Sequence, residues 1–487
     1  MLVRAGSVVS ILGPSGAGKT TLIRAILTPQ ELRRAGHRIT WSERDLGATP
    51  GFVPQRGALL DHLDVASNIT LAQAGSGIPA DAVSWLKAVD LDESLGTPGR
   101  SSSALSGGQA QRVAVARVLA AGRRIIVMDE PSVGLDPLGV RMLARLLVTQ
   151  ARKHRAAILL ITHDLTLAAG ASDRLLFLDP GQRQLVPLLA DWSGPAELDG
   201  NETRQRKLAE VEAAMEDQLL RDRPRLSGGG RGKGAALDPL APVRMAGDAL
   251  LRALDPRLFR EASVVFGRGL EQGFIKPLLF YSIVGALLGF TVPYVVANIS
   301  ADLRPAAVFE LIKGTYILAL APPLSAIIFA ATSGSALSAW LGGLRLHGQV
   351  TALEGLGVPP ARYLWSPSWL ALAVGYAATF AIFTLAMIAG GWVLYTMNDV
   401  HSPLALLTAD FVDPPPSRVP YLVRALWLVA AYTVAIASIV VAKGSESKSR
   451  SEDVTNAMTS SVMRATLFVV VMELATVMVV RAWEAPR

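Results

Sequence analysis

A run of glycines near the start of the chain is spaced to hold phosphate groups. Gly13-Pro14-Ser15-Gly16-Ala17-Gly18-Lys19-Thr20 fits the phosphate-binding loop pattern, in which backbone N–H groups wrap phosphates at a helix N-terminus. Lys19 would supply a cation to the β- and γ-phosphates, and the Thr20 hydroxyl would ligate Mg²⁺. A plain glycine-rich turn is the alternative, but the apolar strand before the run and the helical pattern after it favour a nucleotide site.

Two adjacent acids follow a second apolar stretch. Asp129 and Glu130 stand directly after Ile125-Ile126-Val127-Met128, which is typical of a buried strand. Asp129 suits the ligand shell of Mg²⁺, and Glu130 suits the polarisation of an attacking water. Such a pair alone is more often a helix cap. In a chain that also carries a phosphate-binding loop, it predicts nucleotide hydrolysis.

Further motifs stand in a fixed order around these two. They are Gln55 after a strand, Leu105-Ser106-Gly107-Gly108-Gln109, Ser132-Val133-Gly134-Leu135-Asp136 after Glu130, and His163 after the apolar run 158–162. Over residues 6–165 the whole set resembles the ATPases of the ATP-binding cassette (ABC) family. The resemblance implies a head-to-tail dimer, in which ATP on Lys19 of one copy is closed by Ser106 and Gly108 of the other.

The resemblance also implies roles for individual residues. The expected catalytic residues are Glu130, His163, which would contact the γ-phosphate, and Gln55, which would also sense the membrane part. Mg²⁺ would be held by Thr20, Gln55 and Asp129. The residues expected to contact ATP are Gly13, Pro14, Ser15, Gly16, Ala17, Gly18, Lys19, Thr20, Thr21, Ser106, Gly107, Gly108, Gln109 and Asp136, which would link the two sites. Family members usually carry an aromatic residue before the loop that stacks on adenine. Here none of the twelve residues before Gly13 is aromatic, so either the start is truncated or adenine is held otherwise.

The composition separates two halves that must position these residues. The chain has 487 residues, 51% of them hydrophobic, and a mean hydropathy of +0.37, which argues against a disordered chain and an ordinary soluble enzyme. Long apolar runs begin near Lys276. The absence of cysteine excludes a disulfide scaffold, a thiolate metal site and a cysteine nucleophile. The formal charge of +7 suits basic residues on the cytoplasmic side of a membrane protein better than nucleic-acid binding. No signal peptide precedes the first motif, so we expect a cytoplasmic N-terminus.

The expected fold is an α/β P-loop ATPase domain followed by an all-α transmembrane domain. We expect the chain to divide into an ATPase domain over 1–195, a charged and Gly-rich linker over 196–245, and a permease domain over 246–487. The permease would begin with an interfacial helix at 246–272. About five transmembrane helices would follow, near 277–299, 306–331, 367–397, 421–442 and 465–481. The loops 332–366 and 443–464 hold more Lys and Arg than the opposite loops and would be cytoplasmic.

A stretch of small residues in the apolar half identifies the kind of permease. Gly334-Ser335-Ala336-Leu337-Ser338-Ala339-Trp340-Leu341-Gly342, with Ala352-Leu353-Glu354-Gly355-Leu356-Gly357-Val358-Pro359-Pro360, resembles permeases of the Mla (maintenance of lipid asymmetry) type. The resemblance covers roughly 246–483 and implies phospholipid or other lipid as cargo. It also implies a periplasmic partner with an MCE (mammalian cell entry) domain. A short helix within 343–360, including Glu354 and Gly357, would dock beside Gln55 and couple the two halves; a plain connector is the alternative.

Polar and aromatic residues in the apolar half are candidates for lipid contact. Phe290 and Tyr294 would line a lipid cavity near the outer end of the first span, or act as interface anchors. Glu310 and Lys313, three residues apart, would neutralise each other or act near a headgroup. Glu473 lies deeper, has no local partner in the sequence, and is expected to make a structural hydrogen bond.

These observations support an ATP-driven lipid transporter that works as a homodimer in the inner membrane, with its ATPase in the cytoplasm. Two alternatives remain open. One is an ABC half-transporter for another hydrophobic cargo, although drug and peptide half-transporters usually place six spans before the ATPase. The other is a membrane-anchored regulatory ATPase that transports nothing.

Overall fold

The computed structural model describes two compact units, which are treated separately below. The first contains residues 1–237 and 347–360, and the second contains 238–346 and 361–487. The described residues are 3–14, 16–34, 38, 50–55, 59–76, 81–182, 184–198, 200–221, 256–299, 304–412, 421–446, 448 and 451–484. Ser15 and the Gly-rich part of the expected linker lie outside them.

The first unit is built on a mixed sheet. Its strands are β1 (Val8–Leu12), β2 (Gly51–Val53), β3 (Ile125–Asp129), β4 (Ala157–Ile161), β5 (Arg174–Asp179) and β6 (Gln184–Pro187). The spatial order is β2-β3-β4-β1-β5-β6; all neighbours are parallel except β5 and β6. Every residue of β1 and β4 is buried, as expected of parallel strands covered on both faces. The expected α/β fold is therefore confirmed.

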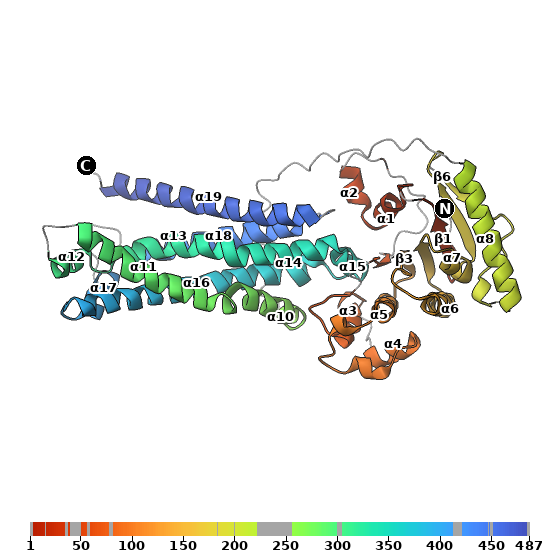
Figure 1. The fold of residues 1–487 in the computed structure, drawn as a ribbon, viewed down its shortest axis with the longest axis horizontal. Coiled ribbons are helices and arrows are strands. Elements are labelled where there is room, and N and C mark those ends of the chain that lie inside the picture. Colours follow the sequence, from red (N-terminus) through yellow and green to blue (C-terminus); the bar gives the residue numbers. More distant parts are fainter. Residues whose placement is uncertain are drawn as a thin grey trace. The chain divides into compact units, whose positions relative to one another are not determined.

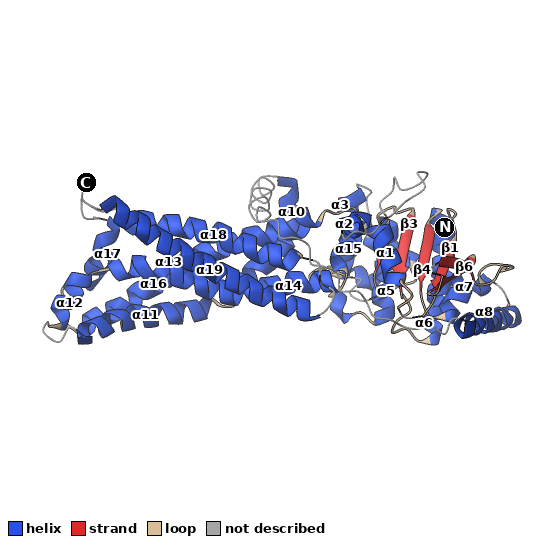
Figure 2. Ribbon diagram, turned by 90° about the horizontal axis from the view of Figure 1, so that it is seen from above, coloured by secondary structure: helices blue, strands red, loops and turns tan. Residues whose placement is uncertain are grey.

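Helices of this unit surround the sheet (Figure 2). They are α1 (Lys19–Leu27), α2 (Pro29–Arg34), α3 (Val65–Ser76), α4 (Ala82–Ala88), α5 (Gly107–Ala120), α6 (Pro137–His154), α7 (Leu165–Ala171), α8 (Asn201–Arg221) and α15 (Gln349–Gly355), with short turns η1 (Glu93–Gly96), η2 (Ser102–Ala104) and η3 (Ala196–Leu198). Because η3 and α8 pack against this unit, its ordered part continues beyond residue 195 into the expected linker.

The second unit is a helix bundle (Figure 1). Its elements are α10 (Pro256–Leu270), η4 (Glu271–Ile275), α11 (Leu278–Ile299), α12 (Pro305–Ile312), α13 (Thr315–Phe329), η5 (Ala330–Gly334), α14 (Ser335–Leu346), η6 (Ala361–Trp365), α16 (Ser366–Met397), α17 (Pro403–Val412), α18 (Tyr421–Ser445) and α19 (Ser451–Glu484). Both views show α12 and α17 together at the end of the bundle where the chain finishes.

The described helices include five that are long and apolar enough to cross a membrane, which confirms the expected number. They are Ala262–Ile299, Thr315–Leu346, Ala361–Met397, Tyr421–Ser445 and Ser451–Val479. The second span begins later than expected, and its helix continues through the small-residue stretch that had been assigned to a loop. The residues between the second and third spans therefore shrink to 347–360.

Small residues let α11 and α16 approach each other closely. A Cβ built on Gly289 of α11 would overlap the backbone of Met387 in α16, and one on Gly390 would overlap that of Ala286. Pro293 lacks an N–H, so the Gly289 carbonyl loses its partner within the helix. The Tyr316 hydroxyl donates to that carbonyl over 2.9 Å. Glycine therefore lets the two backbones meet, and a tyrosine of a third helix satisfies the polar group that the proline frees.

Candidate functional site: a nucleotide site at the edge of the sheet

Four parallel strands bring the expected ATPase residues to one edge of the sheet. The strands β2, β3, β4 and β1 are consecutive neighbours and point the same way. Gln55 follows β2, Asp129 ends β3, His163 follows β4, and the glycine-rich loop follows β1. Segments far apart in the sequence therefore converge at the carboxyl ends of the strands, where open α/β sheets bind their ligands.

The glycine-rich loop has the backbone of a phosphate cradle. Gly16 and Gly18 have φ angles of 86° and 104°, which favour glycine strongly. Helix α1 begins at Lys19, and no described side chain caps its free N–H groups. The Lys19 ammonium donates to the carbonyls of Gly13 and Pro14 over 2.6 and 3.2 Å. Thr20 and Thr21 are exposed at the start of the helix, as a role in binding requires.

Glu130 is fixed in place by its backbone and by the end of β4. Its φ of 47° is unusual for a residue with a side chain, and its N–H donates to the Ile161 carbonyl over 2.8 Å. The side chain is 10% exposed. One carboxylate oxygen, Oε2, accepts from the Thr162 hydroxyl over 3.2 Å and the His163 N–H over 3.1 Å. The same oxygen lies 2.7 Å from Nδ1 of His163. The structure thus brings Glu130 and His163 together, with Thr162 as a partner that the sequence had not indicated.

Asp129 has the electrostatics of a cation ligand. Burial, and next the negative charge of Glu130, raise the pKa of Asp129 from 3.8 to about 6, while the Lys19 ammonium acts in the opposite direction. A carboxylate that burial disfavours is stabilised when a cation binds. The expected Mg²⁺ ligands Thr20, Gln55 and Asp129 offer hydroxyl, amide and carboxylate oxygens, which are the donors that Mg²⁺ prefers. The residues present therefore fit this ion.

The Ser106 motif lies at a different helix N-terminus. Ser106 caps α5, its hydroxyl accepting from the Gln109 N–H over 3.3 Å, and the Gln109 side chain accepts from the Ser106 N–H over 3.0 Å. A Cβ on Gly108 would lie 3.1 Å from the Leu135 side chain. Among the described residues, no hydrogen bond or ion pair joins Ser106 or Gln109 to Lys19. Asp136 caps α6 by accepting from the Gly139 N–H over 2.7 Å.

The short helix α15 packs against β2 within the first unit. A Cβ on Gly355 would lie 2.9 Å from the Phe52 nitrogen and 3.1 Å from the Pro50 oxygen. A Cβ on Gly348, where φ is 73°, would lie 3.3 Å from Pro54. The backbone of α15 therefore approaches the backbone of β2 three to five residues before Gln55. The expected coupling residues Glu354 and Gly357 lie at the end of this helix, half-exposed and exposed respectively.

One of the expected lipid contacts needs a correction, and the expectation for Glu473 is borne out. Glu310 is not inside a span: it is exposed on α12, before the second span begins at Thr315. No ion pair joins Glu310 to Lys313, although both are described residues. The structural hydrogen bond expected of Glu473 is present: its carboxylate accepts from Arg424 and Tyr432 of α18, which become neighbours only when the helices pack. Phe290 and Tyr294 stack on α11 with ring centroids 6.1 Å apart.

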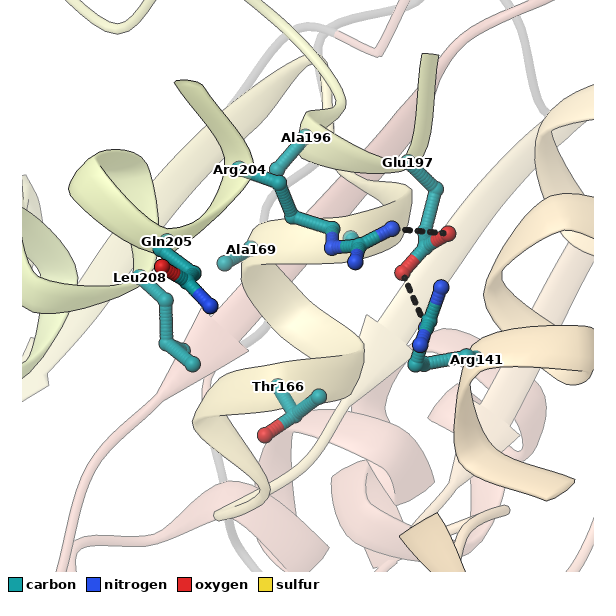
Figure 3. A pocket seen from close by; sticks show the side chains of 9 residues that line it. Arg141, Thr166, Ala169, Ala196, Glu197, Arg204, Gln205 and Leu208 are labelled. Atoms are coloured by element: carbon teal, nitrogen blue, oxygen red, sulfur yellow. Dashed lines mark hydrogen bonds and ion pairs between the residues drawn. The ribbon is translucent and has the colours of Figure 1, made fainter. Parts of the chain in front are cut away.

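A second polar cluster lies away from the nucleotide site (Figure 3). Glu197, whose side chain is buried, lies 3.3 Å from Arg141, 3.0 Å from Arg145 and 3.7 Å from Arg204. These residues line or adjoin a cavity of about 110 Å³ between α6, α7 and α8. Removal of one partner from such a buried ion pair destabilises a protein strongly, so Glu197 fastens the segment after the sheet to the ATPase unit. The local sequence pattern does not reveal this cluster, because the three arginines come from two separate helices, α6 and α8.

Comparisons with known proteins agree with both halves. The family model "ABC transporter" matches residues 1–133, and the model "Permease MlaE" matches residues 266–479. The zinc import ATP-binding protein ZnuC of Paracoccus denitrificans is 38% identical over 181 residues, which are 37% of this chain and 67% of that protein. The hemin import ATP-binding protein HmuV of Streptomyces coelicolor is 34% identical over 190 residues, covering 37% of this chain and 68% of that protein.

Other relatives are matched over a smaller share. The molybdenum import ATP-binding protein ModC of Mycobacterium tuberculosis is 35% identical over 208 residues, and the chain spans 56% of its length. A solved dimeric ATP-binding cassette in a post-hydrolysis state, bound to ADP and Pi, covers 39% of this chain and 89% of that chain at 26% identity and a TM-score of 0.32. The chain therefore belongs to the ABC transporter family, and it joins an ATP-hydrolysing transport ATPase to an MlaE permease in one polypeptide.

Proposed function

We propose that this chain is a subunit of an ATP-driven transporter that moves phospholipid or a related lipid across or out of the inner membrane. The observation that carries the proposal is the union of an ABC ATPase and an MlaE permease domain in one chain. The names of the relatives of the ATPase half refer to import of zinc, molybdenum and hemin. The cargo is therefore inferred from the permease half, whose resemblance to Mla-type permeases implies a lipid.

The nucleotide site would act between two copies of the chain. Lys19, the Gly16 and Gly18 backbone and the exposed Thr20 and Thr21 hydroxyls would bind the phosphates on one copy, and Ser106 to Gln109 of the other copy would close the site. Glu130 would accept a proton from the attacking water, and its bonds to Thr162 and His163 would hold the carboxylate in position. Thr20, Gln55 and Asp129 would hold Mg²⁺, which neutralises charge that develops on the phosphates.

The contact of α15 with β2 supports a coupling role. This helix is formed by the residues that connect the second and third spans. A shift of Gln55 on nucleotide binding would move β2, and the close backbone contact at Gly355 would pass that movement to the adjoining spans. We place the ATPase unit in the cytoplasm, and an MCE-domain protein on the opposite side of the membrane as partner.

Transport by the purified full chain in proteoliposomes tests the proposal. With a fluorescent phosphatidylglycerol in one leaflet, we expect Mg²⁺-ATP to drive its loss from that leaflet or its transfer to an added MCE-domain protein. Glu130→Gln should bind ATP but lower both hydrolysis and transport at least about 100-fold, the lower end of what a general base contributes. ATP hydrolysis by the wild type without movement of lipid, with or without that partner, would refute the lipid cargo and favour another cargo or a regulatory ATPase.

A further inference from the structure

An ion pair lies within the membrane-spanning part of the bundle. Nη2 of Arg424, in α18, lies 2.7 Å from Oε2 of Glu473, in α19. The two side chains are 19% and 20% exposed. The Tyr432 hydroxyl donates to the other carboxylate oxygen, Oε1, over 3.2 Å. Charged groups inside spans are costly, so their presence here calls for a function.

The arginine of this pair is incompletely satisfied. Its Nε is buried and has no hydrogen-bond partner among the described residues. Guanidinium and carboxylate often pair through two parallel hydrogen bonds. Here Glu473 divides its two oxygens between Arg424 and Tyr432 instead, so one N–H of the guanidinium stays free. A ligand with another oxygen would complete the coordination of this edge.

The surroundings of the pair suit the two parts of a phospholipid. Arg424 is three residues from the start of α18, or about 4.5 Å along the helix axis. It therefore lies near the start of the apolar span Tyr421–Ser445, where α18 contacts α17 and where one membrane surface is expected. Exposed apolar side chains border the ion pair on both helices: Val423, Trp427, Val470 and Leu474. Only 11% of the apolar stretch of α19 is buried in the chain, so lipid has lateral access to this face.

We propose that Arg424 binds the phosphate of a phospholipid headgroup at this end of the permease, and that Glu473 and Tyr432 hold the guanidinium in place for it. The inference rests on the proposed lipid transport and names a contact within it. The phosphate oxygens accept hydrogen bonds from the free Nε and from the neighbouring side of the guanidinium. Arginine can donate two such bonds side by side to a phosphate, whereas lysine offers a single ammonium group. The acyl chains lie against Val423, Trp427, Val470 and Leu474. Because Nε is covered in the present arrangement, the phosphate binds when α19 shifts relative to α18.

A charge swap separates headgroup binding from a structural ion pair. Full chains carrying Arg424→Gln, Arg424→Lys, or Arg424→Glu with Glu473→Arg are reconstituted in nanodiscs. Native mass spectrometry measures the phosphatidylglycerol that each variant retains. The rate of ATP hydrolysis is measured while this lipid, or dioleoylglycerol, which has no phosphate, is added in increasing amounts.

We expect at least a tenfold loss of phosphatidylglycerol binding for Arg424→Gln and a smaller loss for Arg424→Lys. The swap should restore thermal stability but not binding. Arg464→Gln removes an exposed cation from α19 and should bind as the wild type does.

The possible outcomes are distinct. Wild-type binding in Arg424→Gln, or full recovery of binding in the swap, would overturn the role of Arg424 while leaving lipid transport intact. Equal stimulation by dioleoylglycerol and phosphatidylglycerol, or displacement of the lipid by millimolar inorganic phosphate, would overturn the headgroup as the ligand. A wild type that neither retains nor moves phospholipid would overturn the proposed function and, with it, this inference.

Discussion

Asp129 and Glu130 occupy adjacent positions at the end of β3, and their environments differ. Glu130 accepts hydrogen bonds from Thr162 and His163. Asp129 is disfavoured as an anion by burial and by its neighbour, so its pKa rises to about 6. The folded protein without nucleotide therefore loses stability as the pH rises through about 6, because an ionised Asp129 costs more in the folded chain than in the unfolded chain.

Replacement of Asp129 by its neutral isostere should relieve this cost. At pH 8, without nucleotide or divalent ion, we expect Asp129→Asn to be about 1–2 kcal/mol more stable, after solvent screening is allowed for. The gain should shrink as the pH falls from about 6 to below 3.8, where the wild-type carboxyl is protonated in both states. Thermal unfolding of the purified chain at pH 8 and pH 5 measures it. An equal change in Tm at both values would contradict the electrostatic origin.

At the scale of the elements, the sequence predicted what depends on local pattern. The apolar strands, the glycine-rich loop and the number of apolar helices all follow from neighbouring residues. It failed where two separate helices meet. Glu473 had no predicted partner, because Arg424 lies 49 positions away, and Glu310 was assigned to a span because nothing in the local pattern separates α12 from α13. The partner of Glu473 did leave one signal in the sequence, because Arg424 is the single arginine in the apolar span over 421–442.

The contact between α11 and α16 gives a test of close helix packing. A methyl group at Gly289 overlaps the Met387 backbone, whereas one at Gly267 of α10 meets nothing within 4 Å. Overpacking costs about 1–3 kcal/mol, and alanine gains about 1 kcal/mol over glycine in a helix. We therefore expect Gly289→Ala to lower the Tm and Gly267→Ala to leave it unchanged or raise it. Unfolding in detergent, followed by tryptophan fluorescence, compares them; a stable Gly289→Ala would mean that the two helices separate easily.

The contact between α15 and β2 gives a test of coupling. A Cβ on Gly355 would press on the Phe52 nitrogen and the Pro50 oxygen, whereas Gly343 of α14 has open space. Gly355→Ala should shift the helix and lower the amount of lipid moved per ATP hydrolysed several-fold. The matched control Gly343→Ala should keep the wild-type ratio. Transport and phosphate release are measured in the same proteoliposomes. A parallel fall of both rates, with their ratio unchanged, would show that the substitution damages the ATPase rather than its link to the spans.

At the scale of the whole molecule, the proposed head-to-tail dimer requires that each complete nucleotide site contain Lys19 of one copy and Ser106 of the other. Lys19→Ala and Ser106→Arg should each abolish hydrolysis in homodimers. A mixed dimer retains one complete site, formed by Lys19 of the Ser106→Arg copy and Ser106 of the Lys19→Ala copy. Random assembly from equal amounts of the two variants makes half of the dimers mixed. About a quarter of the wild-type number of sites should therefore return.

Co-expression with two different affinity tags, followed by sequential purification, isolates the mixed dimer. Its ATP binding and hydrolysis are compared with those of each homodimer. Recovery only in the mixed dimer requires that the two motifs act across the interface between copies. A silent mixed dimer would contradict the predicted recovery: the two motifs would then act within one copy, or hydrolysis would need both sites at once. Activity in either homodimer would mean that the substituted residue is not required for hydrolysis, and its assigned role would have to be abandoned.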